Sequence, residues 1–339
     1  MQNNIILITG GAGFIGSHLV KMLVLKYPQN KIINLDALTY AADLSRLEEI
    51  ANKDNYYFIE GDICNESLVQ NIFKQHKIDG VMHLAAESHV DNSITSPKIF
   101  VETNILGTQN LLDAAKNLWM KDNGQLNRVY QNAKFLHVST DEVYGTLGDV
   151  GYFTETTPYA PNSPYSASKA SSDLLARSYF HTYGMPIVIS NCSNNYGPWQ
   201  HDEKLIPTII RKALAGQKIP IYGNGANIRD WLYVDDHCIA MEDIFRQGKS
   251  GESYNVGSSN EQNNLDLTKM ICKLLDHIKP KAEGNYSELI SFVKDRAGHD
   301  YRYAIDPDKI TRELRWKPKY SFGESLEKTV KWYVENYTK

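Results

Sequence analysis

Tyr165 and Lys169, four residues apart, are the first pair whose types and spacing could do chemistry. That spacing places both side chains on one face of a helix. An ammonium beside a phenol favours the phenolate, so the tyrosine can take a proton from a substrate hydroxyl group. A surface Tyr-Lys pair would look the same, so a second signal is needed. That signal is Thr140, which closes an apolar run 25 residues before Tyr165.

Two acids, Asp141 and Glu142, directly follow Thr140. Regular strand geometry would send these three side chains to alternate faces, so they can meet one substrate only if the chain leaves the strand there. Two adjacent carboxyl groups in a partly dry pocket have pKa values that are pushed apart. One can then serve as an acid and the other as a base, and elimination of water needs both. A solvated acidic turn is the alternative interpretation.

A glycine-rich segment, Gly10–Gly16, follows the first apolar run and opens a helical pattern. Gly11, Gly13 and Gly16 satisfy the GxGxxG pattern, which lets the backbone approach a pyrophosphate at a helix N-terminus. Asp36 lies twenty residues beyond Gly16, where an acid binds the adenosine ribose 2′-hydroxyl. A carboxylate repels a 2′-phosphate, so the sequence predicts NAD rather than NADP. An oxidised nicotinamide would further favour the phenolate of Tyr165.

Short apolar runs alternate with helix-length stretches in the first half of the chain. The expected strands are Ile5–Thr9, Lys31–Asp36, Tyr57–Glu60, Gly80–Leu84, Lys134–Ser139 and Ile187–Cys192, and the expected helices include Gly16–Tyr27, Pro97–Leu118 and Tyr165–Tyr183. This alternation predicts an α/β fold with a Rossmann-like, doubly wound parallel sheet. We expect an NAD-binding domain over 1–190, with returning segments near 229–245, and over 191–339 mostly a smaller C-terminal substrate-binding lobe.

Composition describes an ordinary globular chain of 339 residues, 42% hydrophobic and 22% charged. A net charge of −4 argues against a nucleic-acid partner. No apolar run spans a membrane and no signal peptide is evident, so no membrane partner and a cytoplasmic location are expected. Four scattered cysteines without metal-ligand spacing, and a His89 with no second ligand at i+4 or in an HExxH arrangement, lead us to expect no metal.

These residues resemble the extended short-chain dehydrogenase/reductase family, with Thr140, Tyr165 and Lys169 matching its Ser/Thr-Tyr-Lys triad. The resemblance spans essentially the whole chain. Within the family, the sequence is most similar in its motifs to the dTDP-glucose 4,6-dehydratases. The stretches that carry it are Ser139–Gly145, Leu84–Asp91, Asn191–Pro198, Arg229–Trp231 and Asp295–Asp300. The last departs from the usual pattern by having Ala297 where proline is expected, which removes no functional group.

The resemblance implies residues for both ligands. The NAD contacts would be Gly10, Gly13, Phe14, Ile15, Gly16, Asp36, Ala37, Leu38, Thr39, Asp62, Ile63, Leu84, Ala85, Ala86, Ser88, Thr103, Tyr165, Lys169 and Asn195. The substrate contacts would be Ser88, Thr140, Asn194, Lys204, Leu205, Pro220, Ile221, Tyr222, Arg229, Asn264, Asp295, Arg296, Ala297, Gly298 and His299. Cations among them would meet a diphosphate. A homodimer paired through the helices of 97–118 and 165–183 is also implied, although burial within one chain would give the same apolar pattern.

The implied reaction on dTDP-glucose has three steps, with NAD retained. In the first step Tyr165, aided by Thr140 and Lys169, takes the 4-hydroxyl proton while C4 is oxidised. In the second step Glu142 removes the C5 proton as Asp141 protonates the departing 6-hydroxyl. In the third step C6 is reduced. Three alternatives stay open. A nucleotide-sugar epimerase would have no use for the acid pair, a dehydratase of a CDP-, UDP- or GDP-sugar would differ in its base pocket, and a non-enzymatic NAD sensor would not need the catalytic residues together.

Overall fold

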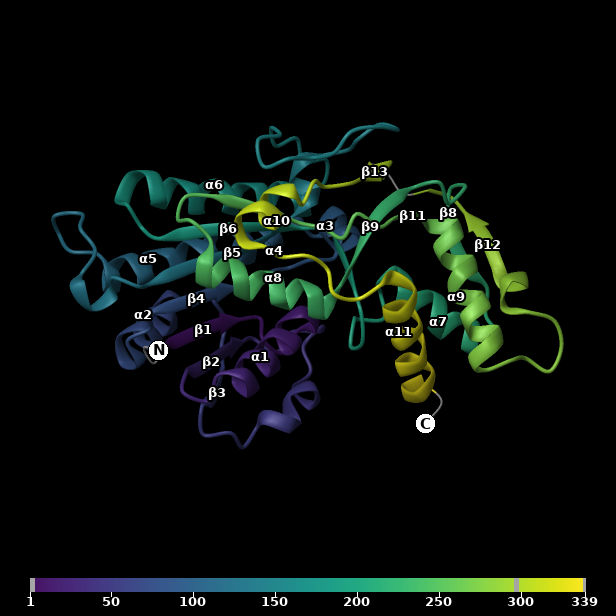
Figure 1. Ribbon diagram of the computed structural model, residues 1–339, viewed down its shortest axis with the longest axis horizontal. Coiled ribbons are helices and arrows are strands. Elements are labelled where there is room, and N and C mark those ends of the chain that lie inside the picture. The colour runs from purple at the N-terminus through teal and green to yellow at the C-terminus, as the bar shows by residue number, and fades with distance from the viewer. Residues whose placement is uncertain (1–3, 296–298, 338–339) are drawn as a thin grey trace.

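A seven-stranded parallel sheet forms the centre of the molecule (Figure 1). The computed structural model describes residues 4–295 and 299–337. The strands are β1 (Ile5–Thr9), β2 (Lys31–Asp36), β3 (Tyr56–Glu60), β4 (Gly80–His83), β5 (Lys134–Thr140), β6 (Ile187–Cys192) and β10 (Ser253–Val256). They lie in the order β10-β6-β5-β4-β1-β2-β3. The six predicted strands are confirmed to within a residue at either end, whereas β10 is a strand that was not predicted.

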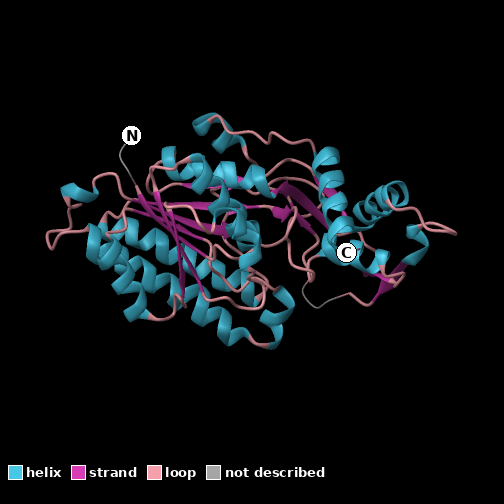
Figure 2. Ribbon diagram, turned by 90° about the horizontal axis from the view of Figure 1, so that it is seen from below, coloured by secondary structure: helices cyan, strands magenta, loops and turns pink. Residues whose placement is uncertain are grey.

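Helices cover both faces of this sheet (Figure 2). The helices α1 (Phe14–Lys26) and α8 (Val234–Gln247) pack on one face, and α2 (Glu66–His76), α5 (Thr108–Trp119) and α6 (Pro164–Tyr183) on the other. Along β1, Ile6 and Ile8 are buried with the first group and Leu7 with the second. This alternation follows from the period of two along a strand. The Rossmann-like α/β prediction is confirmed.

The stretch predicted as one helix over 97–118 is interrupted. It consists of α4 (Pro97–Phe100), a π-helical segment η2 (Val101–Gly107) and α5, and follows α3 (Val90–Thr95). Within η2 the buried Asn104 amide donates to Glu87 O at 3.0 Å and to Ser168 Oγ at 2.8 Å. Wide turns of this kind often accompany functional sites. Here the wide turn directs a polar side chain toward α6.

Smaller elements form a group beside the sheet, to the right in Figure 1. One small sheet contains β7 (Asn194–Tyr196), β9 (Ile228–Tyr233), β11 (Glu261–Asn263) and β13 (Arg302–Tyr303), and another pairs β8 (Ile219–Tyr222) with β12 (Ile290–Val293). The helices here are α7 (Leu205–Leu214), α9 (Asn264–Ile278) and α11 (Phe322–Tyr337). The helix α10 (Asp308–Leu314) instead packs against α8 and β10 of the main sheet. Short turns complete the chain: η1 (Leu44–Ile50), η3 (Arg128–Tyr130), η4 (Asp141–Tyr144) and η5 (Tyr286–Leu289). No helix within residues 4–295 and 299–337 is both long and apolar enough to cross a bilayer.

The chain returns to the main sheet after contributing to the smaller elements. The helix α8 packs against β5 and β6, and β10 pairs in parallel with β6. Both lie beyond residue 190, and α8 overlaps the segment near 229–245 that we expect to belong with the first domain. The division into an NAD-binding and a substrate-binding unit stays our proposal.

Candidate functional site

The turn between β1 and α1 has no room for side chains at Gly10, Gly11 or Gly16. Gly10 has a φ of +74°, and a Cβ there would lie 2.7 Å from Ala85 N. A Cβ on Gly16 would lie 2.0 Å from Gly10 O. Gly13 is the N-cap of α1 and has no side chain to cap the first amides of that helix. Backbone N–H groups are therefore available to an anionic ligand at a helix N-terminus.

Asp36, at the end of β2, is tied to the same turn. Its Oδ2 accepts a hydrogen bond from Ala12 N at 2.8 Å, and its Oδ1 accepts one from Leu38 N at 2.9 Å. The side chain is only 8% exposed, yet it lines the cavity described next. A carboxylate has about four acceptor positions, so two remain for ribose hydroxyl groups. The turn and Asp36 thus fit the adenosine half of a dinucleotide.

A cavity of about 710 Å³ extends from the glycine turn along the carboxyl ends of β1, β4 and β5. All the residues predicted to hold the cofactor line it except Leu38. Of the five predicted catalytic residues, Thr140, Glu142, Tyr165 and Lys169 line it and Asp141 does not. Ligands bind at this edge of open α/β sheets. One cavity therefore brings together the dinucleotide turn and the Tyr-Lys pair.

The acid pair lies where the chain leaves β5. Thr140 is the last residue of β5, and Asp141 and Glu142 begin the turn η4. Glu142 N donates to Thr140 Oγ1 at 3.3 Å, and Thr140 Oγ1 also lies 3.3 Å from Asp141 Oδ1. The predicted departure from strand geometry is confirmed. It sends Glu142 into the cavity and leaves Asp141, 1% exposed, beneath the cavity wall.

The environment of Asp141 favours its neutral form. Burial, and the nearby charges of Glu142 and Asp230, raise its pKa well above the usual 3.8, opposed by Arg229 and by a hydrogen bond from Thr140. Its Oδ2 has no hydrogen-bond partner among the described residues. A protonated carboxyl group beside a second acid is the arrangement expected of an acid–base pair.

The Tyr165–Lys169 pair begins α6. Ser163 and Ser166 form a capping box that fixes the start of the helix, and Lys169 Nζ donates to Val138 O at 2.8 Å. Burial lowers the pKa of Lys169. Burial and the charge of Glu142 raise the pKa of Tyr165, opposed by a hydrogen bond from Thr140. Without the cofactor, burial favours the neutral phenol of Tyr165, whereas the positive charge of an oxidised nicotinamide would act in the other direction. Formation of the phenolate in the presence of bound NAD stays a prediction.

The predicted substrate residues fall into two groups. Ser88, Thr140, Asn194 and Lys204 line the cavity, and Lys204 Nζ donates to Ser88 O at 3.1 Å. Outside the lining, Leu205 begins α7 and Asn264 begins α9. Asn194 Oδ1 and Asn264 Oδ1 are buried and have no hydrogen-bond partner among the described residues. Oriented but unpaired amide oxygens are what a polar ligand can satisfy.

The remaining substrate residues lie among the smaller elements, and Arg296, Ala297 and Gly298 lie outside the described residues. Pro220, Ile221 and Tyr222 are in β8, which pairs with β12 just before Asp295. His299 Nδ1 lies 2.6 Å from Asp295 Oδ1, and its ring is 6.2 Å from that of Tyr222. Arg229 is only 7% exposed. Its guanidinium donates to Asp300 O and Tyr301 O at 2.9 and 3.3 Å.

Sequence reasoning missed several residues around the cavity. Glu203, between β7 and α7, lines it and lies 3.6 Å from His89 Nε2 and 3.5 Å from His201 Nδ1. Cys192 lines it too, and burial raises the pKa of its thiol to about 12. No motif marked Glu203, and its partner His89 is distant in the chain; Cys192 lies within the stretch Asn191–Pro198 but was given no role there. Among the described residues, no group of three or more His, Cys, Asp or Glu could hold a metal ion.

The parallel sheet, the glycine turn with Asp36, and the Thr-Tyr-Lys group define an extended short-chain dehydrogenase/reductase. The family model described as GDP-mannose 4,6 dehydratase matches residues 7–329. A dTDP-glucose 4,6-dehydratase of Shigella flexneri is 52% identical over 98% of this chain and 93% of that protein, and dTDP-glucose 4,6-dehydratase 1 of Escherichia coli K12 is 51% identical over the same shares. The chain belongs to the nucleotide-sugar 4,6-dehydratase family, among the dTDP-glucose 4,6-dehydratases.

Solved structures agree with this placement and also show its limit. A dTDP-glucose 4,6-dehydratase from Streptomyces venezuelae with NAD bound is 43% identical, covers 98% of this chain and 97% of that one, and has a TM-score of 0.88. A UDP-glucose 4-epimerase from Thermotoga maritima is 29% identical, covers 98% and 99%, and has a TM-score of 0.84. Fold similarity alone barely separates the two activities, so the distinction rests on the site.

Proposed function

We propose that this chain is an NAD-dependent hydro-lyase that converts dTDP-glucose to dTDP-4-keto-6-deoxyglucose and water. The observation that carries the proposal is the placement of Thr140, Glu142, Tyr165 and Lys169 in one cavity, with the neutral-favouring acid Asp141 directly behind its wall. An epimerase needs the tyrosine and the lysine only. The acid pair supplies the two further proton transfers that loss of water requires.

The turn Gly10–Gly16 and Asp36 fit NAD on the geometry given above. NAD, when bound, supplies the hydride acceptor for C4 and the hydride donor for C6, so the cycle has no net redox change. The side chains of this protein would hold and move the protons. Lys169, fixed to Val138 O, would provide positive charge close to Tyr165. Conversion of Tyr165 to its phenolate would prepare it to take the 4-hydroxyl proton, with Thr140 as its hydrogen-bond partner.

The elimination would be shared between the two acids. The 4-ketone acidifies the C5 hydrogen, and Glu142, which faces the cavity, would remove that proton. Asp141 would give its proton to the departing 6-hydroxyl, so that water leaves. The alkene left between C5 and C6 then gains hydride at C6 and a proton at C5 from Glu142, which returns Glu142 to its ionised form. The proton that Tyr165 took from the 4-hydroxyl, exchanged through solvent, would return to Asp141 and complete the cycle. Asn194 and Lys204 at the cavity, with Arg229 and His299 beyond it, would bind the nucleoside diphosphate.

To test the proposal, the purified protein is incubated with NAD and, in separate reactions, with dTDP-, UDP-, CDP- or GDP-glucose. Mass spectrometry and NMR should find a 4-keto-6-deoxy product from the dTDP sugar. A substrate deuterated at C4 should give product deuterated at C6, with solvent hydrogen at C5. A C4 epimer formed without loss of water, or release of the label into the NADH of the solution, would contradict the proposal.

We further propose a homodimer located in the cytoplasm. The helices α4, η2 and α6 pack together, and they carry exposed apolar side chains, with Val101 46% and Leu174 57% exposed. An apolar helix face of this kind is suited to pairing with a second copy. The family resemblance implies a dimer through the same helices. The cytoplasmic location is supported by four free cysteines, three of them buried.

A further inference from the structure

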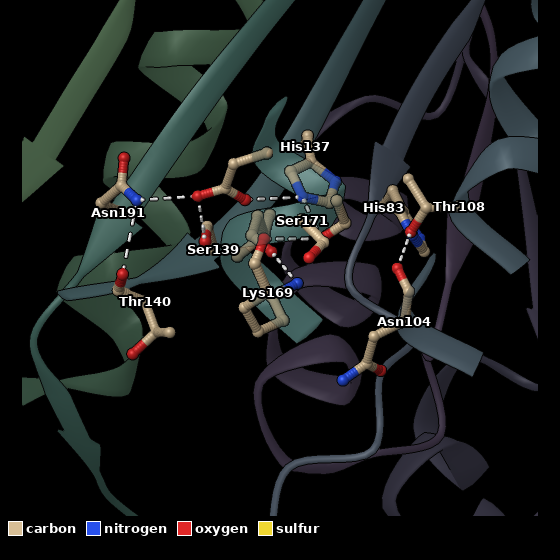
Figure 3. Close-up of polar contacts among 12 residues, drawn as sticks. His83, Asn104, Thr108, His137, Ser139, Thr140, Lys169, Ser171 and Asn191 are labelled. Carbon is tan, nitrogen blue, oxygen red and sulfur yellow. Dashed lines mark hydrogen bonds and ion pairs between the residues drawn. The ribbon is translucent and has the colours of Figure 1, made fainter. Parts of the chain in front are cut away.

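A buried carboxylate, Asp173, contacts polar residues around the catalytic pair. Three of its partners, His137, Ser139 and Asn191, are shown near Lys169 in Figure 3. Asp173 follows Lys169 by four residues in α6 and is 1% exposed. On a helix, side chains at this spacing have Cβ atoms about 5–6 Å apart. Tyr165, Lys169 and Asp173 therefore occupy successive turns of one face of α6. Nothing in the reaction outlined above uses Asp173.

Both oxygens of Asp173 accept hydrogen bonds from elements that carry the site. Oδ2 accepts from Ser139 Oγ at 2.7 Å, from Tyr159 Oη at 2.9 Å and from Asn191 Nδ2 at 3.3 Å. Oδ1 lies 3.0 Å from His137 Nε2. Three groups donate to Oδ2, and His137 can donate to Oδ1 from its Nε2–H tautomer, so the ionised, acceptor-only form fits every contact. Donors that surround a buried carboxylate stabilise its negative charge.

The same contacts attach α6 to the end of β5 that carries Thr140. Lys169 Nζ donates to Val138 O, and the next residue of β5, Ser139, donates to Asp173. Asn191 Nδ2, from the neighbouring strand β6, bridges Asp173 Oδ2 and Thr140 O, the second contact also being 3.3 Å. Hydrogen bonds therefore connect α6 to two consecutive residues of β5, Val138 and Ser139, directly before Thr140.

The buried ammonium of Lys169 needs a compensating charge. Lys169 is 4% exposed, and burial of an ammonium without a counter-charge is costly. The titratable groups facing it and Asp173 are His83 on β4, His137 on β5, Cys192 on β6, Tyr144 and Asp141 on η4, and Tyr159 before α6. Burial lowers the pKa of both histidines, and burial raises those of the thiol, the two phenols and Asp141. All six groups are therefore biased toward neutrality.

We propose that Asp173 is a positioning residue of this site: its fixed negative charge balances the Lys169 ammonium, and its hydrogen bonds hold the end of β5 in place. The inference rests on the proposed dehydratase function. The charge of Asp173 acts to raise the pKa of Lys169 against the lowering effect of burial. Loss of this charge would therefore release the lysine proton at a lower pH and leave Tyr165 without a cationic neighbour.

The test compares Asp173→Asn with Tyr159→Phe in the full-length protein. The first change removes the charge, and the second removes one hydrogen bond to the same oxygen while the charge stays. The alkaline limb of the kcat–pH profile should move down by about one pH unit or more in Asp173→Asn only. NMR of lysine-labelled protein, with the Lys169 signal assigned by its loss in Lys169→Met, should show the same shift in pKa.

Equal profiles and equal Lys169 titrations in the two variants would overturn the proposal, because a merely structural role predicts that result. Should Asp173→Asn fail to fold, the side-chain carboxyl ¹³C shift of Asp173 in the wild-type protein decides. An ionised group near neutral pH supports the proposal, and a protonated one overturns it. The Lys169 titration needs no substrate, so it remains decisive even if the wild-type protein fails to dehydrate any hexose, an outcome that would count against the proposed function alone.

Discussion

At the residue scale, Asp141 and Glu142 show how neighbouring acids in one turn are given different surroundings. Glu142 lines the cavity, whereas Asp141 is buried behind it with one oxygen unsatisfied by the described residues. Burial raises the pKa of Asp141, and the charge of Glu142 adds to the effect. An acid that stays protonated next to one that can ionise is suited to simultaneous proton donation and removal.

Replacing Tyr165 and Glu142 separately should divide the reaction into its steps. Tyr165→Phe should abolish oxidation at C4, and Glu142→Gln should permit that oxidation but stop before water leaves, so that a 4-keto-glucose nucleotide accumulates. Each change should reduce turnover by about a hundred- to ten-thousand-fold, the usual contribution of one acid–base group. Single-turnover mass spectrometry of the sugar measures both effects. Normal turnover by Glu142→Gln would show that another group is the base.

Asp141→Asn should lower activity and raise stability, increasingly so at higher pH. The pKa of Asp141 is higher in the folded protein than the usual 3.8. The protonated group therefore contributes its full stability below pH 3.8, and this contribution is lost as pH rises through the pKa of the folded protein. Asparagine imitates the neutral acid at every pH. Thermal unfolding should therefore give a higher Tm for the variant near pH 8 and equal values near pH 4, and a pH-independent difference would contradict this account.

At the element scale, two strand-to-helix connections do most of the positioning. In the β1–α1 turn, Gly10, Gly11 and Gly16 allow a closer backbone approach than a Cβ would permit, and the N-cap Gly13 has no side chain to cap the first amides of α1. The β5–η4 turn ends the strand at Thr140 and directs Glu142 into the cavity. Both turns lie at the carboxyl edge of the parallel sheet, where neighbouring strand ends converge.

Gly16→Ala should disable the first of these turns. Its Cβ would lie 2.0 Å from Gly10 O, a backbone atom that can move only with the whole turn. Overpacking of this kind costs about 1–3 kcal/mol, and the displaced amides should weaken NAD binding. Calorimetry of NAD binding and thermal unfolding measure the two effects. Gly148→Ala is the control, because a Cβ there meets nothing within 4 Å and should change neither.

At the scale of the whole molecule, the site depends on chain segments that return from far along the sequence. The loop carrying Glu203 and Lys204 reaches back to the β4 side of the cavity, where Lys204 contacts Ser88 116 residues away. The strand β10 extends the main sheet after the chain has built β8 and β9. The main sheet with its helices and the group of smaller elements are therefore not two continuous segments that one boundary in the sequence would divide.

The proposed dimer places the exposed face of α6 in an interface, so Leu174→Glu should yield a monomer. A charged side chain at this position would be desolvated in the interface and left unpaired. Light scattering after size-exclusion chromatography measures the mass. Val150→Glu is a matched control, because Val150 is 83% exposed and lies in the loop between η4 and α6, outside the helices of the proposed interface. A wild-type monomer, or a Leu174→Glu dimer, would refute the arrangement.

The sequence by itself determined the features that depend on local spacing. The glycine turn with Asp36, the Tyr165–Lys169 pair and six strands of the sheet were predictable, because hydrophobic period and motif spacing act within a few tens of residues. Tertiary structure alone decided that Asp141 is buried while Glu142 is not, and that Asp173 meets Ser139 and His137 from 34 and 36 residues away. Desolvation and buried hydrogen bonds depend on which segments pack together, and no local pattern in one sequence encodes that.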